Sequence, residues 1–256
     1  MKKVLLGIGG LLALVVMTFG AMMGSIFSGL KEMPDGQELP GGAKRVNHGY
    51  TSAYLVPIGE KELALIDCAD EPDAAAIKAE LTRRGLGVDA VKAIFITHGH
   101  PDHTGGCKQF PGAQLFIGDG EQPLIEGKAA SKGPLPGLMG PQKEFALTGA
   151  RALKDGEAVE VGTLKVRAFV IPGHTPGSAA FLAAGVLYVG DSFTFNTDGS
   201  VRKAPWLFSD DGAVNVESIK RLGKLLAPEA ADVKAMVPSH SGSVEGLKAL
   251  VDYAGG

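Results

Sequence analysis

The stretch that decides the fold is THGHPDHTGG, residues 97–106. Three of the six histidines of the chain lie in it, and an aspartate separates the second from the third. Histidine and aspartate are both good ligands for Zn²⁺ in proteins. Because histidine is so scarce in this chain, a chance cluster of this kind is rare, and the stretch predicts a metal site.

The spacing within this stretch predicts two metal ions rather than one. In an extended backbone, residues i and i+2 point to the same side, so His98 and His100 can bind one ion. Asp102 and His103 follow Pro101, where the chain turns, and they point elsewhere. Four ligands in six residues cannot surround one tetrahedral ion without strain, whereas two neighbouring ions remove this difficulty.

Four apolar stretches of the chain end at a side chain that can bind metal. AIFIT runs into His98, AFVIPG into His174, VLYVG into Asp191 and AMVPS into His240. Sites in α/β proteins gather at the carboxyl ends of strands, so we expect these four ends to meet at one rim. His174 would then complete the first ligand set and His240 the second, with Asp191 bridging both ions. We expect His48, the sixth histidine, in a loop outside the site.

The body of the chain alternates predicted strands and helices. We expect strands or hairpins within residues 52–59, 61–70, 91–97, 113–118, 158–173, 178–191 and 233–240, and helices within 71–86, 215–226 and 243–254. Residues 120–148 have no clear periodicity and are expected to form a long loop. A helical turn within this loop fits the same residues. Its apolar residues Leu124, Ile125, Leu135, Leu138 and Met139 fit a lid or ordinary core contacts, and Phe193, Phe195, Trp206 and Phe208 fit a pocket wall or plain core.

The amino-terminal segment differs from the rest of the chain. After Lys2 and Lys3 no charged residue occurs before Lys31, a run longer than the ~18 apolar residues of a membrane-spanning helix. We expect a signal anchor at residues 1–30, with a cleaved signal peptide as the alternative. The lysines favour a cytoplasmic amino terminus, which places the rest of the chain across the membrane, or in the periplasm or outside the cell after cleavage. Residues 31–45 are expected to be a linker to the domain at 46–256.

Composition excludes some classes of function. The formal net charge of −3 gives no basic footprint for nucleic acid, so we expect a small-molecule partner. The two cysteines, Cys68 and Cys107, fit neither a disulfide-rich scaffold nor a Cys-x-x-Cys metal clip. We expect two buried thiols, and a disulfide only if the domain lies outside the cytoplasm.

The motifs THGHPDH, PGHTPGS, VGDS and PSH occur in this order, after the opening YLV…LALIDCAD. Together they resemble the metallo-β-lactamase-fold hydrolase superfamily over residues 46–245. The resemblance implies an α/β fold, a four-layer αββα sandwich with a metal site at one edge of its two sheets. It also implies the ligands: His98, His100 and His174 for one ion, Asp102, His103 and His240 for the other, and Asp191 for both. Two Zn²⁺ per chain are expected, although iron or manganese suits the same donors.

The chemistry that this ligand set predicts is hydrolysis of a carbonyl compound. A zinc-bound hydroxide would attack an ester, thioester, lactone or lactam, and the metals would stabilise the anion that develops. Asp102 is the predicted catalytic residue, because it can orient the nucleophile and transfer a proton.

Other functions stay open at this point. A β-lactamase proper is the first alternative, because Ser192 after Asp191 matches an Asp-Ser pair of one subclass. A sulfur dioxygenase with a single iron would reuse the first ligand set, and a non-catalytic, membrane-tethered binding module would retain metal without turnover. Glyoxalase II-like thioesterases are disfavoured, because they usually have a histidine near Ser178 and a glutathione-binding carboxyl-terminal part.

Overall fold

The computed structural model describes residues 2–256, with the side chains of residue 14 and residues 16–256. The chain divides into two compact units, Met1–Leu30 and Lys31–Gly256. The first unit contains helix α1 (Lys2–Phe27). Across the described residues, no helix is both long enough and apolar enough to cross a membrane. The signal segment expected at residues 1–30 falls partly on side chains outside the described residues.

The second unit is built on two six-stranded sheets. The first has the order β1 (Lys44–His48), β2 (Thr51–Pro57), β3 (Leu63–Ile66), β4 (Val91–Ile96), β5 (Gln114–Gly118) and β6 (Arg151–Leu153). The second has the order β14 (Val244–Glu245), β13 (Ala235–Pro238), β10 (Val186–Gly190), β9 (Ala179–Ala183), β8 (Leu164–Val170) and β7 (Ala158–Val161). Strands β11 (Phe193–Phe195) and β12 (Val201–Lys203) form a separate pair.

The helices are α2 (Ala75–Arg83), α3 (Pro101–Thr104), α4 (Gln122–Ile125), α5 (Pro134–Met139), α6 (Gly212–Leu226) and α7 (Lys248–Gly255). Asp211 is the N-cap of helix α6, and its carboxylate accepts hydrogen bonds from the first-turn amides of Ala213 and Val214. Its residues Ile219 and Leu222 are spaced three apart and lie on one buried face.

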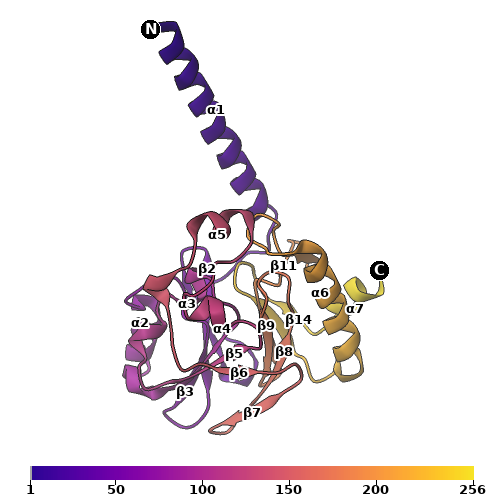
Figure 1. Ribbon diagram of the computed structural model, residues 1–256. Coiled ribbons are helices and arrows are strands. Elements are labelled where there is room, and N and C mark those ends of the chain that lie inside the picture. The colour runs from indigo at the N-terminus through magenta and orange to yellow at the C-terminus, as the bar shows by residue number, and fades with distance from the viewer. Residues whose placement is uncertain (1) are drawn as a thin grey trace. The chain divides into compact units, whose positions relative to one another are not determined.

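The sheets and helices form the layers of a sandwich (Figure 1), and three buried clusters hold the layers together. The central cluster fills the space between the sheets with residues such as Phe95 and Phe181. A second cluster packs α2, through Ile77, against the outer face of the first sheet. A third packs α6 and α7, through Leu222 and Leu250, against the outer face of the second sheet. This arrangement confirms the predicted α/β sandwich.

Strand directions bring the ends of several strands to one edge. In the first sheet β3, β4, β5 and β6 pair in parallel. In the second sheet β10 and β13 are parallel, and β8 and β10 both run antiparallel to β9, so β8, β10 and β13 share one direction. The amide of Ala179 donates to the carbonyl of Thr97 and joins the two sheets at this edge.

Several elements differ from the sequence-based expectation. Residues 31–45, expected as a linker, belong to the second compact unit, where Leu39 and Ala43 are buried. The segment at 120–148 is a loop with helical turns, as expected, but it contains two of them, α4 and α5, where one was expected. Cys68 and Cys107 are buried as expected, but they form a disulfide rather than two thiols.

Replacing both cysteines, C68A with C107A, is expected to lower the free energy of unfolding. The disulfide joins positions 39 residues apart, and closing a loop of this size in the unfolded chain contributes about 2–4 kcal/mol. Urea unfolding of wild type, the double variant and reduced wild type measures the effect. Equal stabilities of oxidised and reduced wild type would contradict this expectation.

Glu80 on α2 gives a pH dependence. Hydrogen bonds from Arg83, and after them Arg84, hold the pKa of Glu80 at about 2 despite burial, against an ordinary value of 4.5. A lowered folded-state pKa stabilises the protein above pH 4.5, and this stabilisation is lost as the pH falls through 2. E80Q should therefore cost about 1–2 kcal/mol at pH 7, because exposed Arg83 is partly screened.

Unfolding free energies measured from pH 7 to pH 2 should show the E80Q deficit shrinking toward the acid end. E62Q is the control, because the Glu62 carboxylate is half exposed and its ion pair with Lys92 is long, at 3.8 Å. A deficit in E80Q that did not change with pH would contradict the electrostatic origin.

Candidate metal centre

Three of the predicted ligands form a first cluster. The Nε2 atom of His98 lies 3.0 Å from Nδ1 of His100, and Nε2 of His174 lies 3.1 Å from each of them. His98 and His100 follow β4, and His174 follows β8, so the two sheets supply this cluster together. All three side chains are buried.

Four predicted residues form a second cluster beside the first. Nε2 of His240 lies 3.2 Å from Asp102 Oδ2 and 2.9 Å from Asp191 Oδ2, and Nε2 of His103 lies 3.3 Å from Asp191 Oδ1. Asp191 Oδ2 is also 3.7 Å from Nε2 of His174 in the first cluster. Asp191 therefore lies between the two clusters, where a bridging ligand would have to be.

The donor atoms of both clusters fit metal ions. Three imidazole nitrogens at mutual distances of 3.0–3.1 Å cannot all hydrogen-bond to one another, whereas one cation can accept a lone pair from each. In the second cluster, the buried atoms His103 Nε2 and Asp191 Oδ1 have no hydrogen-bond partner among the described residues. The seven residues are thus brought together as the ligand prediction requires, and their role as ligands stays a prediction.

Most of these imidazoles are oriented by a partner on the ring nitrogen that points away from the clusters. Nδ1 of His103 lies 2.8 Å from Asp67 Oδ2, and Nδ1 of His240 lies 2.7 Å from the carbonyl oxygen of Tyr50. Nδ1 of His174 lies 3.1 Å from the Ser209 hydroxyl. A hydrogen bond to this outer nitrogen fixes the tautomer that leaves the inner nitrogen free to bind metal.

The two clusters differ in their electrostatics. Burial above all lowers the pKa of His174 to about 3 and keeps the pKa of His98 and His100 below the usual range. These imidazoles are neutral at pH 7, which is the form that binds metal. Burial opposes a charge on His240, but the nearby Asp191 and Asp102 carboxylates raise its pKa to about 10. The second cluster thus has an environment that favours a cation.

A glycine permits the close approach of the strand ends. Gly190 ends β10 directly before Asp191 and has a positive φ of 55°. A Cβ atom there would lie 2.4 Å from the hydroxyl oxygen of Thr97, the residue directly before His98. Only glycine allows this backbone conformation and this contact together.

His48 lies outside both clusters, as expected. Its Nδ1 pairs with the Asp70 carboxylate, and its Nε2 lies 3.2 Å from Glu71. The hydrogen bond to Asp70 raises the pKa of His48.

The apolar residues expected as a lid or pocket wall divide into three groups, of which Leu135 and Phe208 form the partly buried one. Leu124, Ile125, Phe193 and Phe195 are buried core residues. Leu138 on α5 is 86% exposed, Met139 61% and Trp206 59%. The segments that carry them are joined, because the Leu135 amide donates to the Leu207 carbonyl. Exposed apolar side chains therefore occur on two joined segments, α5 and residues 204–209.

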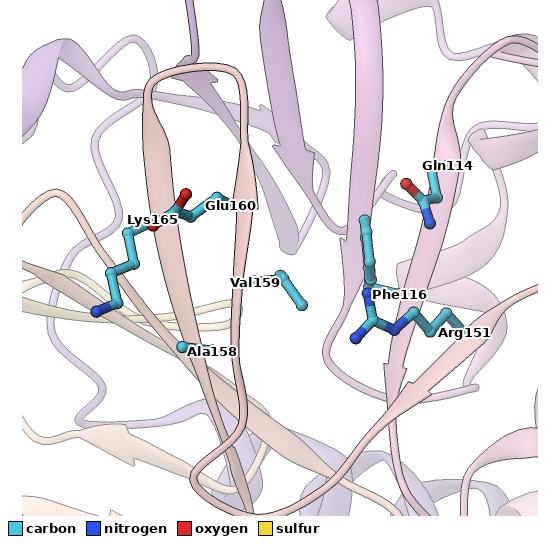
Figure 2. Close-up of a pocket in the computed structure, with 7 residues that line it drawn as sticks. All are labelled: Gln114, Phe116, Arg151, Ala158, Val159, Glu160 and Lys165. Atoms are coloured by element: carbon cyan, nitrogen blue, oxygen red, sulfur yellow. The ribbon is translucent and has the colours of Figure 1, made fainter.

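A cavity of about 510 Å³ lies elsewhere in the fold (Figure 2). It is lined by Gln114, Phe116, Arg151, Ala158, Val159, Glu160 and Lys165. Gln114 and Arg151 begin β5 and β6, so this cavity is at the amino ends of the parallel strands, whereas the two clusters follow the carboxyl ends.

Sequence reasoning did not assign a role to Asp67. This buried residue follows β3, and its carboxylate accepts hydrogen bonds from the Thr97 amide and hydroxyl as well as facing His103. The signal was present, because an acidic residue directly after an apolar strand resembles the endings that identified His98 and Asp191. Ser209, beside His174, had no comparable signal.

Sequence comparisons place the chain in the same family that its motifs resemble. The sequence model described as "Metallo-beta-lactamase superfamily" matches residues 46–240. The hydroxyacylglutathione hydrolases of Brucella ovis and Brucella canis are each 35% identical over 143 residues, which is 54% of this chain and 47% and 46% of theirs. The chain thus spans about half the length of the curated relatives it matches.

Solved structures share the fold. A metallo-beta-lactamase family protein from Thermus thermophilus has a TM-score of 0.62 and 25% identity, covering 82% of this chain and 77% of that protein. MEM-A1, a subclass B3 metallo-beta-lactamase from a soil metagenome library, has a TM-score of 0.61 and 24% identity, covering 82% and 81%.

The D67N variant tests the orientation of His103. Asparagine tolerates the positive φ of 57° at this position, so the substitution changes one acceptor and not the backbone. Loss of such an outer partner typically costs about 10–100-fold in metal affinity, and we expect this loss at the second cluster. Chelator competition measures it, with D89N on the surface as the control. Equal affinities in the two variants would contradict the role of Asp67.

Proposed function

The chain belongs to the metallo-beta-lactamase superfamily, and on this premise we propose that it is a dinuclear zinc hydrolase acting on a small carbonyl substrate. The observation that carries the proposal is the position of Asp191, 2.9 Å from His240 and 3.7 Å from His174, between two clusters of metal-binding side chains. A carboxylate next to both clusters supports two ions that act on one substrate, which two separate sites without a shared carboxylate would not.

Each residue has a role in this proposal. His98, His100 and His174 hold one ion, and Asp102, His103 and His240 hold the other. Zinc bound there supplies a Lewis acid for the carbonyl oxygen and an activated water at neutral pH. Burial disfavours charge on Asp102, but His103 and His240 keep the pKa of its carboxyl group well below the usual range. Asp102 is therefore an ionised acceptor that can orient a nucleophilic water.

Thioesters are the substrate class that we propose first. The matched relatives are named hydroxyacylglutathione hydrolases, which runs against the expectation that this subgroup is remote. Because only about half of their length is matched, the glutathione portion of their substrate need not apply here. The segment that carries the exposed Trp206 also carries Ser209, which contacts His174, and this favours a substrate with an apolar part.

A position outside the cytoplasm is a further part of the proposal. The Cys68–Cys107 disulfide supports it, because such bonds persist in oxidising compartments. The apolar sequence at residues 1–30 is the corresponding signal anchor or signal peptide in this proposal.

Metal content and turnover test the function together. The protein purified without chelator should contain about two zinc ions per chain, and chelation should abolish thiol release from an acyl thioester until zinc is restored. H174A and D102N should lose about 10²–10⁴-fold in kcat/KM, whereas H48A, which changes a histidine outside both clusters, should retain activity.

Other outcomes would reject the proposal in distinct ways. One iron per chain with oxygen uptake on a persulfide would indicate a dioxygenase. Turnover of β-lactams without turnover of thioesters would indicate a β-lactamase. Retained zinc without hydrolysis of thioesters, esters, lactones or lactams would indicate a binding protein.

A further inference from the structure

Glu121 is a buried carboxylate that belongs to neither metal cluster. It follows β5 and directly precedes α4, and its side chain is fully buried. Although it occupies the position before the first helical residue, its carboxylate makes no capping bond to α4 among the described contacts. The carboxylate instead points to two loops that come from different sheets.

The carboxylate of Glu121 holds these two loops through three hydrogen bonds. Its Oε1 atom accepts from the Gly99 amide at 2.6 Å. Its Oε2 atom accepts from the Gly177 amide at 2.8 Å and from the Thr175 hydroxyl at 2.9 Å. Gly99 separates His98 from His100, and Thr175 directly follows His174. One side chain thus connects the backbones next to all three imidazoles of the first cluster.

The backbone around this carboxylate leaves no room for larger residues. A Cβ atom at Gly99 would lie 2.9 Å from Leu124 Cβ and 3.2 Å from Glu121 Oε1. A Cβ atom at Gly177 would lie 2.2 Å from the Glu121 amide nitrogen. Both glycines therefore allow the loops after β4 and β8 to approach Glu121 directly. A shift of the Glu121 carboxylate would displace these two loops, which carry His98, His100 and His174.

Burying the Glu121 carboxylate costs folding free energy that an apolar side chain at this position would not. Burial raises the pKa of Glu121 to about 7, although the three donors oppose this shift. An unpaired buried carboxyl group is unfavourable unless hydrogen bonds satisfy it. An apolar residue would avoid this cost if the position served only to fill the core.

We propose that Glu121 is a positioning residue that sets the spacing of His98, His100 and His174, an inference that rests on the proposed metal-dependent function. The three hydrogen bonds fix the separation of the loop after β4 from the loop after β8. That separation keeps the three imidazole nitrogens 3.0–3.1 Å apart, at a common point where one ion can bind.

The E121Q variant tests the proposal in the full chain. Glutamine has the same shape but replaces one acceptor oxygen with an amide donor, which must face either Gly99 or the pair Thr175 and Gly177. Zinc binding is measured by competition with a chromophoric chelator, which resolves the two equivalents. We expect one equivalent to bind about 10–100-fold more weakly, the other to change less than twofold, and kcat to fall more than KM rises. E126Q, the same substitution at the end of α4, is the matched control.

A second pair of variants covers the case in which E121Q does not fold. T175V removes the hydroxyl donor at constant shape and should weaken the same equivalent by a smaller factor, and T175S should restore it. Thermal unfolding of the metal-free variants separates positioning from general stability.

Each outcome decides between the alternatives. Wild-type binding of both equivalents in E121Q and T175V would overturn the role of Glu121 alone. Equal weakening of both equivalents, with a lower unfolding temperature of the metal-free protein, would show a general structural role and overturn it as well. Wild-type protein that binds no zinc would overturn the proposed function itself.

Discussion

Three imidazole nitrogens that face one another at about 3 Å are the constraint on which the rest of the structure depends. Such an arrangement leaves lone pairs opposed unless a cation binds between them, so the fold must hold the rings against their mutual repulsion. Parallel strand directions bring the ring-bearing loops to one edge, and glycines allow the loops to meet. The Thr97 hydroxyl beside His98 and the Ser209 hydroxyl beside His174 then orient two of these rings from their outer nitrogens.

The sequence predicts the parts of this arrangement that depend on short-range pattern. Apolar strands that end at His98, His174, Asp191 and His240 are visible from residue type alone and predict a common rim, whereas the sandwich was implied by the family resemblance. Strand β1 was missed because its residues, among them Lys44, Arg45 and Asn47, are polar and lack clear alternation. Its place at the sheet edge comes from pairing with β2, which is a tertiary contact.

The residues that surround the two clusters were harder to predict than the members of the clusters. Asp67 and Glu121 make hydrogen bonds to residues between 22 and 56 positions away, such as Gly99, Thr97 and Gly177. No local spacing encodes such contacts. The disulfide has the same character, because Cys68 and Cys107 come together only when the loop after β3 packs on the segment after α3, where the Cys68 amide donates to the His103 carbonyl.

The order of the clusters along the chain has a consequence for biosynthesis. All three residues of the first cluster have been synthesised by residue 174, whereas the second cluster lacks His240 until 66 more residues have been added. A nascent chain therefore presents a three-histidine set well before the four-residue set exists. The two clusters are therefore completed at different stages of synthesis. Asp191 can contact His240 only after β13 and the loop that follows it have left the ribosome.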